Sequence, residues 1–358
     1  MLTLQSRRRR DLEDTVPRTE AAARRNPKSA TLIDVAQLAR VSVSTASKAL
    51  NGRSDVAETT RERVVEAARR LNFVPNTLAK SLQTGRSGTV GLITHDFDGR
   101  FSIPLLMGAE DAFGVNKVSV LLCDARGDAI RERYHLDVLM QRRVDGLIIV
   151  GARPDTRPTL GRGLPVPVVY AYAPSDDPED CSIVSDNVAA GDLGVSHLLA
   201  AGRRHVAIIA GDTTYGAAVE RVHGAKRRLS EAGLESLGGD AFFGSWTEPW
   251  GRAAMRTILT QYPEVDGVLC GNDQIARGAL DTLRDEGRRV PDDVSVVGHD
   301  NWEILATGAR PTLTSIEMNL EEIGRLAAQR LAEAMEGNVS HGVEYMAPHL
   351  VVRASSVA

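Results

Sequence analysis

Apolar residues recur every three or four positions over residues 31–50, and this spacing predicts two short helices. The first covers 32–39 and follows Thr31, whose hydroxyl suits the N-cap position. The second covers about 43–50 and follows Ser42, which has the same capping chemistry. Two helices joined by so short a turn form the helix-turn-helix layout, in which the second helix lies in the major groove of DNA.

The apolar positions of this segment also predict a small hydrophobic core. The stripe of the first helix consists of Leu32, Val35, Ala36, Leu38 and Ala39. The seam between the two helices consists of Ala36, Val41, Ala46 and Leu50. A third helix over about 58–71 closes the core with Val64, Val65, Ala68 and Leu71. The second helix is left with outward-facing side chains, namely Val43, Ser44, Thr45, Ser47 and Lys48.

After Gly88 the pattern changes to short β-branched runs that alternate with amphipathic stretches. The runs predict strands at 89–94, 118–123, 145–150, 167–170, 206–210, 267–270 and 294–298. The amphipathic stretches predict helices at 103–113, 130–141, 188–200, 216–231 and 274–286. Strands that are buried on both faces and alternate with helices indicate a parallel α/β sheet, and this many units predicts two such sheets.

The helical block at 29–74 resembles the DNA-binding headpiece of the lactose-repressor (LacI/GalR) family of bacterial transcription factors. The matching positions are Thr31, Asp34, Val35, Ala36, Val41, Ser42, Thr45, Ser47, Leu50 and Asn51. Ala46 and Lys48 replace the commoner Val and Arg of the family. By helix position and by resemblance, the residues expected to read base edges are Val43, Ser44 and Lys48. Those expected at phosphates, which carry no sequence information, are Thr31, Ser42, Thr45 and Asn51.

Residues 75–87 resemble the hinge helix and linker of the same family. The resemblance implies that a pair of these helices enters the minor groove through Ala79, Lys80 and Leu82. Leu82 matches the apolar residue that wedges between base pairs, at a cost in unstacking that contacts with the bent duplex offset. The alternative is that Leu82 is a core residue of a linker helix, but this segment has too few apolar residues to bury a face.

The resemblance extends over 88–358 through blocks such as 143–148, 271–273, 297–301 and 311–316. It implies two Rossmann-like lobes of the periplasmic sugar-binding kind, with a ligand in the cleft between them. Lobe 1 is expected at about 88–185 plus 317–345, and lobe 2 at about 187–315 plus 346–358. The chain is expected to cross between lobes near 185–186, 315–318 and 346–350. Open parallel sheets bind ligands at the carboxyl ends of their strands, which supports the same location.

Several residues match positions that contact the effector in this family. They are Asp300, Arg221, Trp246, Asp186, Phe101, Arg100 and Tyr215. Asp300 and Asp186 would accept hydrogen bonds from ligand hydroxyls, and Arg221, on the first helix of lobe 2, would offer its planar guanidinium to adjacent oxygens. Each residue also has a structural alternative: Asp300 as a strand-end cap, Arg221 as a solvated helix charge and Trp246 as a core aromatic.

Charge is distributed unevenly between the two parts of the chain. The formal net charge is −4, but residues 1–87 hold 17 Lys/Arg and 9 Asp/Glu, whereas the remainder holds 26 and 38. A basic head on an acidic body suits a DNA-binding module attached to a domain that does not bind DNA. Residues 1–28, with the cluster at 7–10, are expected to be a disordered basic extension. The alternatives are extra phosphate contacts by that cluster, or a start of the chain further downstream.

Other classes of protein receive little support from the sequence. There is no nucleophile-elbow, P-loop or zinc-protease motif, although two carboxylates such as Asp186 and Asp300 leave a glycosidase formally open. Three widely spaced cysteines, Cys123, Cys181 and Cys270, predict reduced thiols without a metal site. No cofactor is expected. No apolar run is long enough to cross a bilayer and no signal segment is evident, so a cytoplasmic, nucleoid-associated protein without a membrane partner is expected.

The sequence therefore predicts an α/β protein with an all-α helix-turn-helix headpiece and hinge helix, followed by a two-lobed periplasmic-binding-protein-like domain. Its expected function is that of a homodimeric, non-enzymatic transcriptional repressor on a pseudo-palindromic double-stranded DNA operator. A small-molecule effector, by resemblance a sugar or sugar derivative of a carbohydrate-utilisation operon, would act by its differential affinity for two states. The alternative is a cytosolic sugar-binding or signalling protein whose headpiece has lost operator binding.

Overall fold

The structure is a computed structural model that describes residues 30–50, 53, 55–73, 85–96, 100–114 and 118–357. The expected basic extension at 1–28, the phosphate contact Asn51 and the hinge residues Ala79, Lys80 and Leu82 lie outside these residues. The chain divides into two compact units, Met1–Thr77 and Leu78–Ala358.

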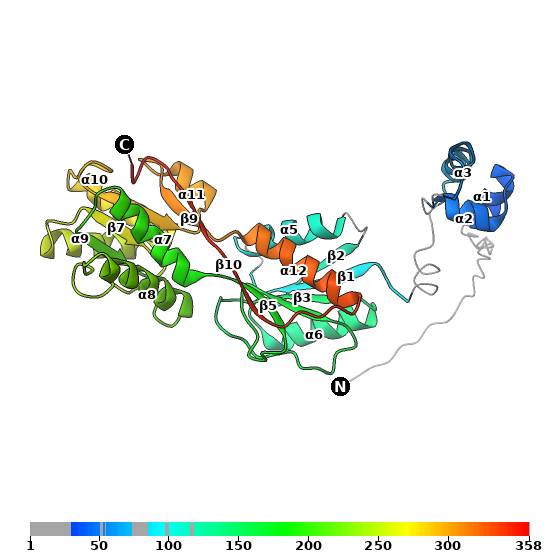
Figure 1. The fold of residues 1–358 in the computed structure, drawn as a ribbon, viewed down its shortest axis with the longest axis horizontal. Helices are drawn as coiled ribbons and strands as arrows, with labels where there is room; N and C mark the ends of the chain where they lie inside the picture. Colours follow the sequence, from blue (N-terminus) through cyan, green and yellow to red (C-terminus); the bar gives the residue numbers. More distant parts are fainter. Residues whose placement is uncertain are drawn as a thin grey trace, which may run out of the picture. The chain divides into compact units, whose positions relative to one another are not determined.

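Three helices make up the described part of the first unit (Figure 1): α1 (Leu32–Ala39), α2 (Val43–Leu50) and α3 (Glu58–Arg70). Their buried side chains form a core of Val35, Ala36, Ala39, Ala46, Ala49, Val56, Val64, Ala67 and Ala68. Leu38 and Val65, which the spacing predicted to be buried, are 45% and 50% exposed. Successive helical residues differ in direction by about 100°, so this small core takes Val64 and Ala67 and leaves Val65 in solvent.

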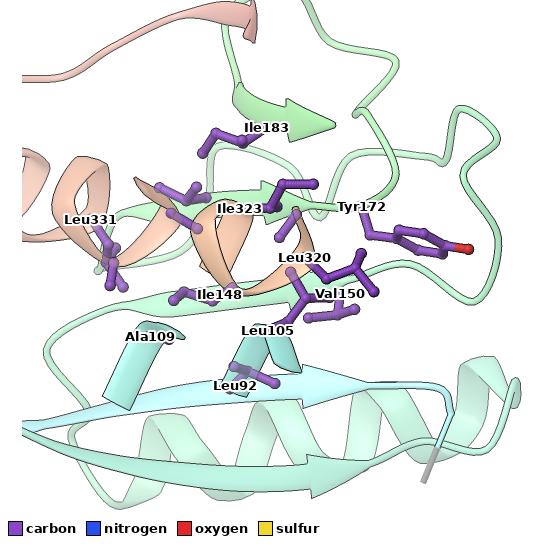
Figure 2. Close-up of a cluster of buried hydrophobic side chains, with 14 of the residues drawn as sticks. Leu92, Leu105, Ala109, Ile148, Val150, Tyr172, Ile183, Leu320, Ile323 and Leu331 are labelled. Carbon is purple, nitrogen blue, oxygen red and sulfur yellow. The ribbon is translucent and has the colours of Figure 1, made fainter. Parts of the chain in front are cut away.

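Lobe 1 of the second unit is built on a six-stranded parallel sheet with the order β10-β5-β4-β3-β1-β2. The strands are β1 (Thr89–Thr94), β2 (Ser119–Asp124), β3 (Leu147–Val150), β4 (Val168–Ala171), β5 (Cys181–Ser185) and β10 (Gly342–Met346). Two helices, α5 (Ser102–Gly114) and α12 (Leu320–Met335), pack on one face through the cluster drawn in Figure 2. Helix α6 (Ala129–Gln141) packs on the opposite face through Leu136 and Leu139.

Lobe 2 is built on a five-stranded sheet with the order β11-β9-β8-β7-β6. The strands are β6 (Val206–Ile209), β7 (Gly267–Cys270), β8 (Ser295–His299), β9 (Thr314–Glu317) and β11 (His349–Val351). The expected parallel pairing holds except at β11, which pairs antiparallel with β9 at the sheet edge. Helices α7 (Asn187–Ala200) and α8 (Gly216–Glu231) cover one face, and α9 (Glu248–Gln261) and α10 (Asp273–Asp285) cover the other, while α11 (Glu303–Gly308) follows β8.

The chain passes between the two sheets after β5, after β9 and after β10, and these three passages are hydrogen-bonded to one another. The backbone N–H of Asp186 donates to the Met346 carbonyl (3.0 Å), and the Ser185 hydroxyl donates to the Met318 carbonyl (3.1 Å). The Asn319 side-chain amide donates to the Ala347 carbonyl (2.7 Å). These bonds link the three passages directly.

Three helix pairs approach so closely that glycine is required on both helices. In the α5–α12 pair, a Cβ on Gly108 would lie 1.8 Å from the Glu321 carbonyl oxygen, and one on Gly324 would lie 2.0 Å from that of Leu105. Corresponding glycines occur in the α7–α8 and α9–α10 pairs, namely Gly191 with Gly224 and Gly251 with Gly278. Each pair therefore packs backbone against backbone on a sheet face.

The start of lobe 1 is tied to both β3 and α12. The Asp145 carboxylate accepts hydrogen bonds from the backbone N–H groups of Ser87 and Gly88, each at 2.7 Å. The Arg86 guanidinium donates to the carbonyl oxygen of Met335, the last residue of α12 (2.6 Å). The segment that leads into lobe 1 is thus held at the C-terminal end of α12.

Candidate DNA-binding surface and effector cleft

Helix α2 presents the side chains that the sequence assigned to DNA. Val43, Ser44 and Lys48 are exposed, and Thr45 and Ser47 are partly buried. The Ser42 hydroxyl caps the helix, because it accepts a hydrogen bond from the Thr45 N–H at 3.0 Å. Three expected base-reading side chains therefore lie on one solvent-facing helix whose start is fixed by its own cap.

Thr31 caps α1 through a reciprocal capping box with Asp34. The Asp34 carboxylate accepts from both the N–H and the hydroxyl of Thr31, each at 2.7 Å, and these bonds hold the pKa of Asp34 below its usual value. In return, the Thr31 hydroxyl accepts from the Asp34 N–H at 3.4 Å. The Thr31 hydroxyl is therefore engaged within the headpiece.

Lys48 is paired with a carboxylate of its own headpiece. Its ammonium lies 2.6 Å from Asp55, both side chains are about half exposed, and the hydrogen bond from Lys48 lowers the pKa of Asp55. An exposed pair of this kind contributes little to stability, so Lys48 can leave Asp55 for another anionic partner at little cost.

Arg61 on α3 holds the C-terminal end of α2, a role that the sequence analysis did not assign. Its guanidinium donates to the carbonyls of Ala49 (3.3 Å) and Arg53 (2.8 Å). A cation at a helix C-terminus satisfies carbonyls that have no partner within the helix. Arg61 therefore positions α2 against α3.

A cleft of about 530 Å³ lies where the strands of both lobes end. The residues that line it are His95, Asp96, Arg100, Phe101, Ala152, Arg153, Pro154, Tyr172, Tyr215, Ala217, Arg221, Trp246, Asn272, Gln274, Asp300 and Trp302. They follow β1, β3 and β4 in lobe 1 and β6, β7 and β8 in lobe 2. This volume falls within the range of small-molecule sites.

Asp300 is fully engaged by neighbours from both lobes. It follows β8 with a left-handed φ of 95°, an uncommon conformation for a residue with a side chain. Its carboxylate pairs with Arg100 from lobe 1 and accepts from His299 Nδ1 at 3.0 Å. Burial raises the pKa of Asp300, but Arg100, His299 and Arg221 outweigh that effect and hold it below the usual value. The carboxylate is therefore ionised and bridges the cleft.

Burial and the Arg221 charge lower the pKa of His299 to about 4, so this histidine is neutral at pH 7. Beneath it, burial and the Asp300 charge raise the pKa of Asp273 to about 8. Asp273 accepts hydrogen bonds from the Trp302 N–H (2.7 Å) and the Ser315 hydroxyl (2.5 Å). Asp273 thereby positions the loop that carries Asp300 and Trp302 without lining the cleft itself.

Arg221 reaches the cleft from α8, which is the second helix of lobe 2 and not the first as expected. Its guanidinium donates to the Asn187 side chain (3.0 Å) and to the Gly271 carbonyl (2.7 Å). Burial lowers its pKa, and it forms no ion pair within the described ranges. With a weaker contact to the Met318 sulfur (3.9 Å), its orientation is therefore set by neutral acceptors alone.

Two aromatic pairs face the cleft. Phe101 and Tyr172 of lobe 1 stack with their centroids 5.3 Å apart, and Tyr215 and Trp246 of lobe 2 meet edge to face at 5.6 Å. The Trp246 indole lies over Gly211, where a Cβ would come within 2.3 Å of the ring. The backbone of lobe 2 thus fixes one aromatic wall.

His95 lines the cleft and is held from behind by a buried charge cluster. Its Nε2 lies 2.6 Å from Glu132, which also accepts from Arg157 at 2.7 Å. These partners outweigh burial and lower the pKa of Glu132 to about 2, so the carboxylate is ionised and His95 Nε2–H donates. His95 Nδ1 has no hydrogen-bond partner among the residues that the structure describes.

Six of the seven predicted effector residues meet in the cleft, and Asp186 does not. Its carboxylate instead caps α7 by accepting from the Ala189 N–H at 2.8 Å. The sequence analysis did not single out the other lining side chains, notably His95, Arg153, Tyr172, Asn272 and Trp302. Asn272 had a detectable signal, because it lies two residues after the end of the predicted strand at 267–270.

Two family models match the chain. Residues 31–76 match the model described as "Bacterial regulatory proteins, lacI family", and residues 195–356 match the "Periplasmic binding protein-like domain". The chain is 35% identical over 341 residues to the HTH-type transcriptional regulator CelR of Thermobifida fusca, an alignment that covers 93% of this chain and 99% of that protein. The chain belongs to the LacI family of bacterial regulatory proteins.

Other similarities agree with this family. The ribose operon repressor of Escherichia coli is 33% identical over 302 residues, covering 83% of this chain and 91% of the repressor. A structure described as a CelR–cellobiose complex is 31% identical, covers 91% of this chain and all of that one, and gives a TM-score of 0.61. The lac repressor dimer bound to operator and the anti-inducer ONPF is 27% identical, covers 92% and 100% of the two chains, and gives a TM-score of 0.71.

The family member described here is a DNA-binding transcriptional regulator with a helix-turn-helix headpiece and a periplasmic-binding-protein-like fold. The relatives named above are regulators by description. Among the described helices, none has the length and apolar character needed to cross a membrane.

Proposed function

We propose that the protein represses transcription as a homodimer on a pseudo-palindromic operator. Its affinity for the operator changes when a carbohydrate occupies the cleft. The observation that carries this proposal is the cleft itself, in which Asp300, Arg221 and Trp246 converge from separate elements of lobe 2. Carboxylate and guanidinium groups bind hydroxyls, and aromatic faces stack on sugar rings. A relative, CelR, is described in complex with cellobiose.

Contacts to DNA are assigned by position on the headpiece. Val43, Ser44 and Lys48 are proposed to read base edges because they are exposed on the recognition helix. Thr31, Ser42, Thr45 and Asn51 are proposed to contact phosphates. The hinge residues Ala79, Lys80 and Leu82 are proposed to enter the minor groove when two hinge segments pair.

Dimerisation is assigned to lobe 1. Ile103 and Met107 lie one turn apart on α5 and are 40% and 52% exposed. The neighbouring strand β2 is a sheet edge and exposes Leu121. Exposed apolar side chains beside an unpaired edge are typical of a protein interface.

The test is fluorescence anisotropy with duplexes from the upstream region of the protein's own gene, with and without cellobiose and other sugars. Repressor function predicts dimer-dependent binding to one duplex, a steep loss of affinity with salt, and a change in affinity with one class of sugar. Sugar binding without any duplex binding would instead favour a signalling protein that has lost its operator. If the protein binds an operator and none of the sugars changes that affinity, the cleft assignment is refuted.

A further inference from the structure

The cleft is cationic within an acidic domain. Residues 88–358 contain 26 Lys/Arg against 38 Asp/Glu, yet the charged residues with a fixed sign that line the cleft are three arginines and two aspartates. They are Arg100, Arg153, Arg221, Asp96 and Asp300. Because Arg100 and Asp300 neutralise each other, the remaining charges are those of Arg153 and Arg221 against Asp96.

The two remaining arginines flank one aromatic pair. The Arg153 guanidinium, from lobe 1, lies 4.3 Å from the centroid of the Tyr215 ring. The Arg221 guanidinium lies 6.0 Å from the Trp246 ring, and the two rings meet at 5.6 Å. A sugar ring placed on this aromatic wall would therefore have a guanidinium on each side.

Neither arginine forms an ion pair in the part of the chain that the structure describes. The carboxylates nearest to them in sequence already have hydrogen-bond partners. Asp155 accepts from the Gly216 N–H (2.6 Å), and Glu220 accepts from the Asn187 side-chain amide (3.1 Å). The third acidic group, Asp96, accepts from the Phe101 N–H (3.4 Å). Asp300 acts on Arg221, and Arg153 acts on Asp212, only through space. Among the described residues, both guanidinium groups therefore remain without a direct carboxylate contact at the aromatic wall.

Arg221 is desolvated, and a desolvated cation without a direct carboxylate partner is costly. Arg153 is exposed, and an anionic ligand would form charge-assisted hydrogen bonds with both guanidinium groups. We infer that the effector is an acidic sugar, a uronic or aldonic acid, whose ring stacks on Trp246 and Tyr215. This inference rests on the proposed function, in which the effector is a carbohydrate. The effector's carboxylate lies between Arg153 and Arg221. Neutral hydroxyls would leave the desolvated Arg221 without a direct anionic contact.

Isothermal titration calorimetry of the full-length protein tests this with two matched pairs, glucose against glucuronate and cellobiose against cellobionate, at equal sodium concentration. The acidic member of at least one pair is expected to bind about tenfold more tightly than its neutral partner. Raising sodium chloride from about 0.05 M to about 0.5 M is expected to shrink the difference, because salt screens the attraction.

Substitutions locate the effect. Arg153→Gln is expected to reduce the acidic preference below about threefold, and Arg153→Lys to retain part of it. The matched control is Arg162→Gln, which removes an exposed arginine of lobe 1 that pairs with Asp177 outside the cleft, and which should retain the full preference. An acidic preference that survives Arg153→Gln would refute the assigned position.

The outcomes separate this inference from the proposed function. Equal or tighter binding of the neutral sugars would overturn the acidic effector while leaving a carbohydrate effector in place. Failure of all four sugars to bind, with operator affinity unchanged by any of them, would overturn both.

Discussion

At the scale of single residues, burial beside the cleft keeps one histidine, His299, uncharged. The pKa of His299 is lowered to about 4, whereas an unfolded histidine titrates near 6.5. The unfolded chain therefore binds the proton first as pH falls. Stability from the neutral form is complete above pH 6.5 and is lost between about 6.5 and 4.

His299→Asn is expected to remove this acid sensitivity while preserving a donor toward Asp300. From pH 7.5 to pH 5 the His299 contribution to the free energy of unfolding falls by about 2 kcal/mol, and the variant should lack that part of the loss. Urea unfolding at both pH values measures it. Half-buried His197, whose pKa is also lowered by burial, remains in both proteins. The exposed His341→Asn is the control, and an equal flattening in both variants would refute the assignment.

If Lys48 reads a base edge as proposed, Asp55 and DNA compete for its ammonium group. Asp55→Asn is expected to tighten operator binding about two- to fivefold at low salt, because Lys48 no longer exchanges one partner for another. Glu66→Gln removes the same charge from the headpiece on α3, where Glu66 pairs with Arg69. Anisotropy titrations of the two variants separate release of Lys48 from net charge, and equal gains would argue for net charge alone.

At the scale of elements, reciprocal glycines set the distance between paired helices. Gly324→Ala would place a Cβ against the Leu105 carbonyl, and we expect a loss of about 1–3 kcal/mol in the free energy of unfolding. Gly114→Ala, at the end of α5 with no atom within 4 Å, is expected to be neutral or slightly stabilising. Urea midpoints of both variants test this, and comparable losses would show that helix spacing is not the cause.

Local patterns predicted many of these elements. The end-to-end match of α8 with the expected 216–231, and the confirmed caps at Thr31 and Ser42, follow from periodicity and capping chemistry over a few residues. Helices α9 and α12 were not among the expected elements. The partner of α12 is α5, about 200 residues away, and sequence spacing does not reveal that pairing.

Local patterns also left residue roles ambiguous at the site. An aspartate before a helix is equally suited to cap it or to bind a ligand, and for Asp186 the fold selects the cap. The Arg100–Asp300 pair and the His95–Glu132–Arg157 cluster join residues from different loops, so they depend on tertiary packing. The tendency of parallel sheets to bind ligands at the carboxyl ends of their strands predicted where the cleft lies, but it did not identify these partners.

At the scale of the whole molecule, the proposed control by an effector requires that cleft occupancy and operator binding influence each other. Linkage makes this influence reciprocal, so the factor by which saturating effector changes the operator Kd must equal the factor by which operator changes the effector Kd. A factor of about 5–150 is typical. Titrating each ligand in the presence and absence of the other measures both factors, and unequal factors would show that a further state or an oligomer change takes part.

Helix α12 begins beside the cleft residues Phe101 and Tyr172 and ends where Arg86 enters lobe 1. Its 16 residues span about 24 Å, because each helical residue rises 1.5 Å. One added turn would move its two ends apart by about 5.4 Å, and half a turn would rotate its apolar face away from the sheet. An insertion or deletion in α12 would therefore require compensating changes both beside the cleft and at the contact with Arg86.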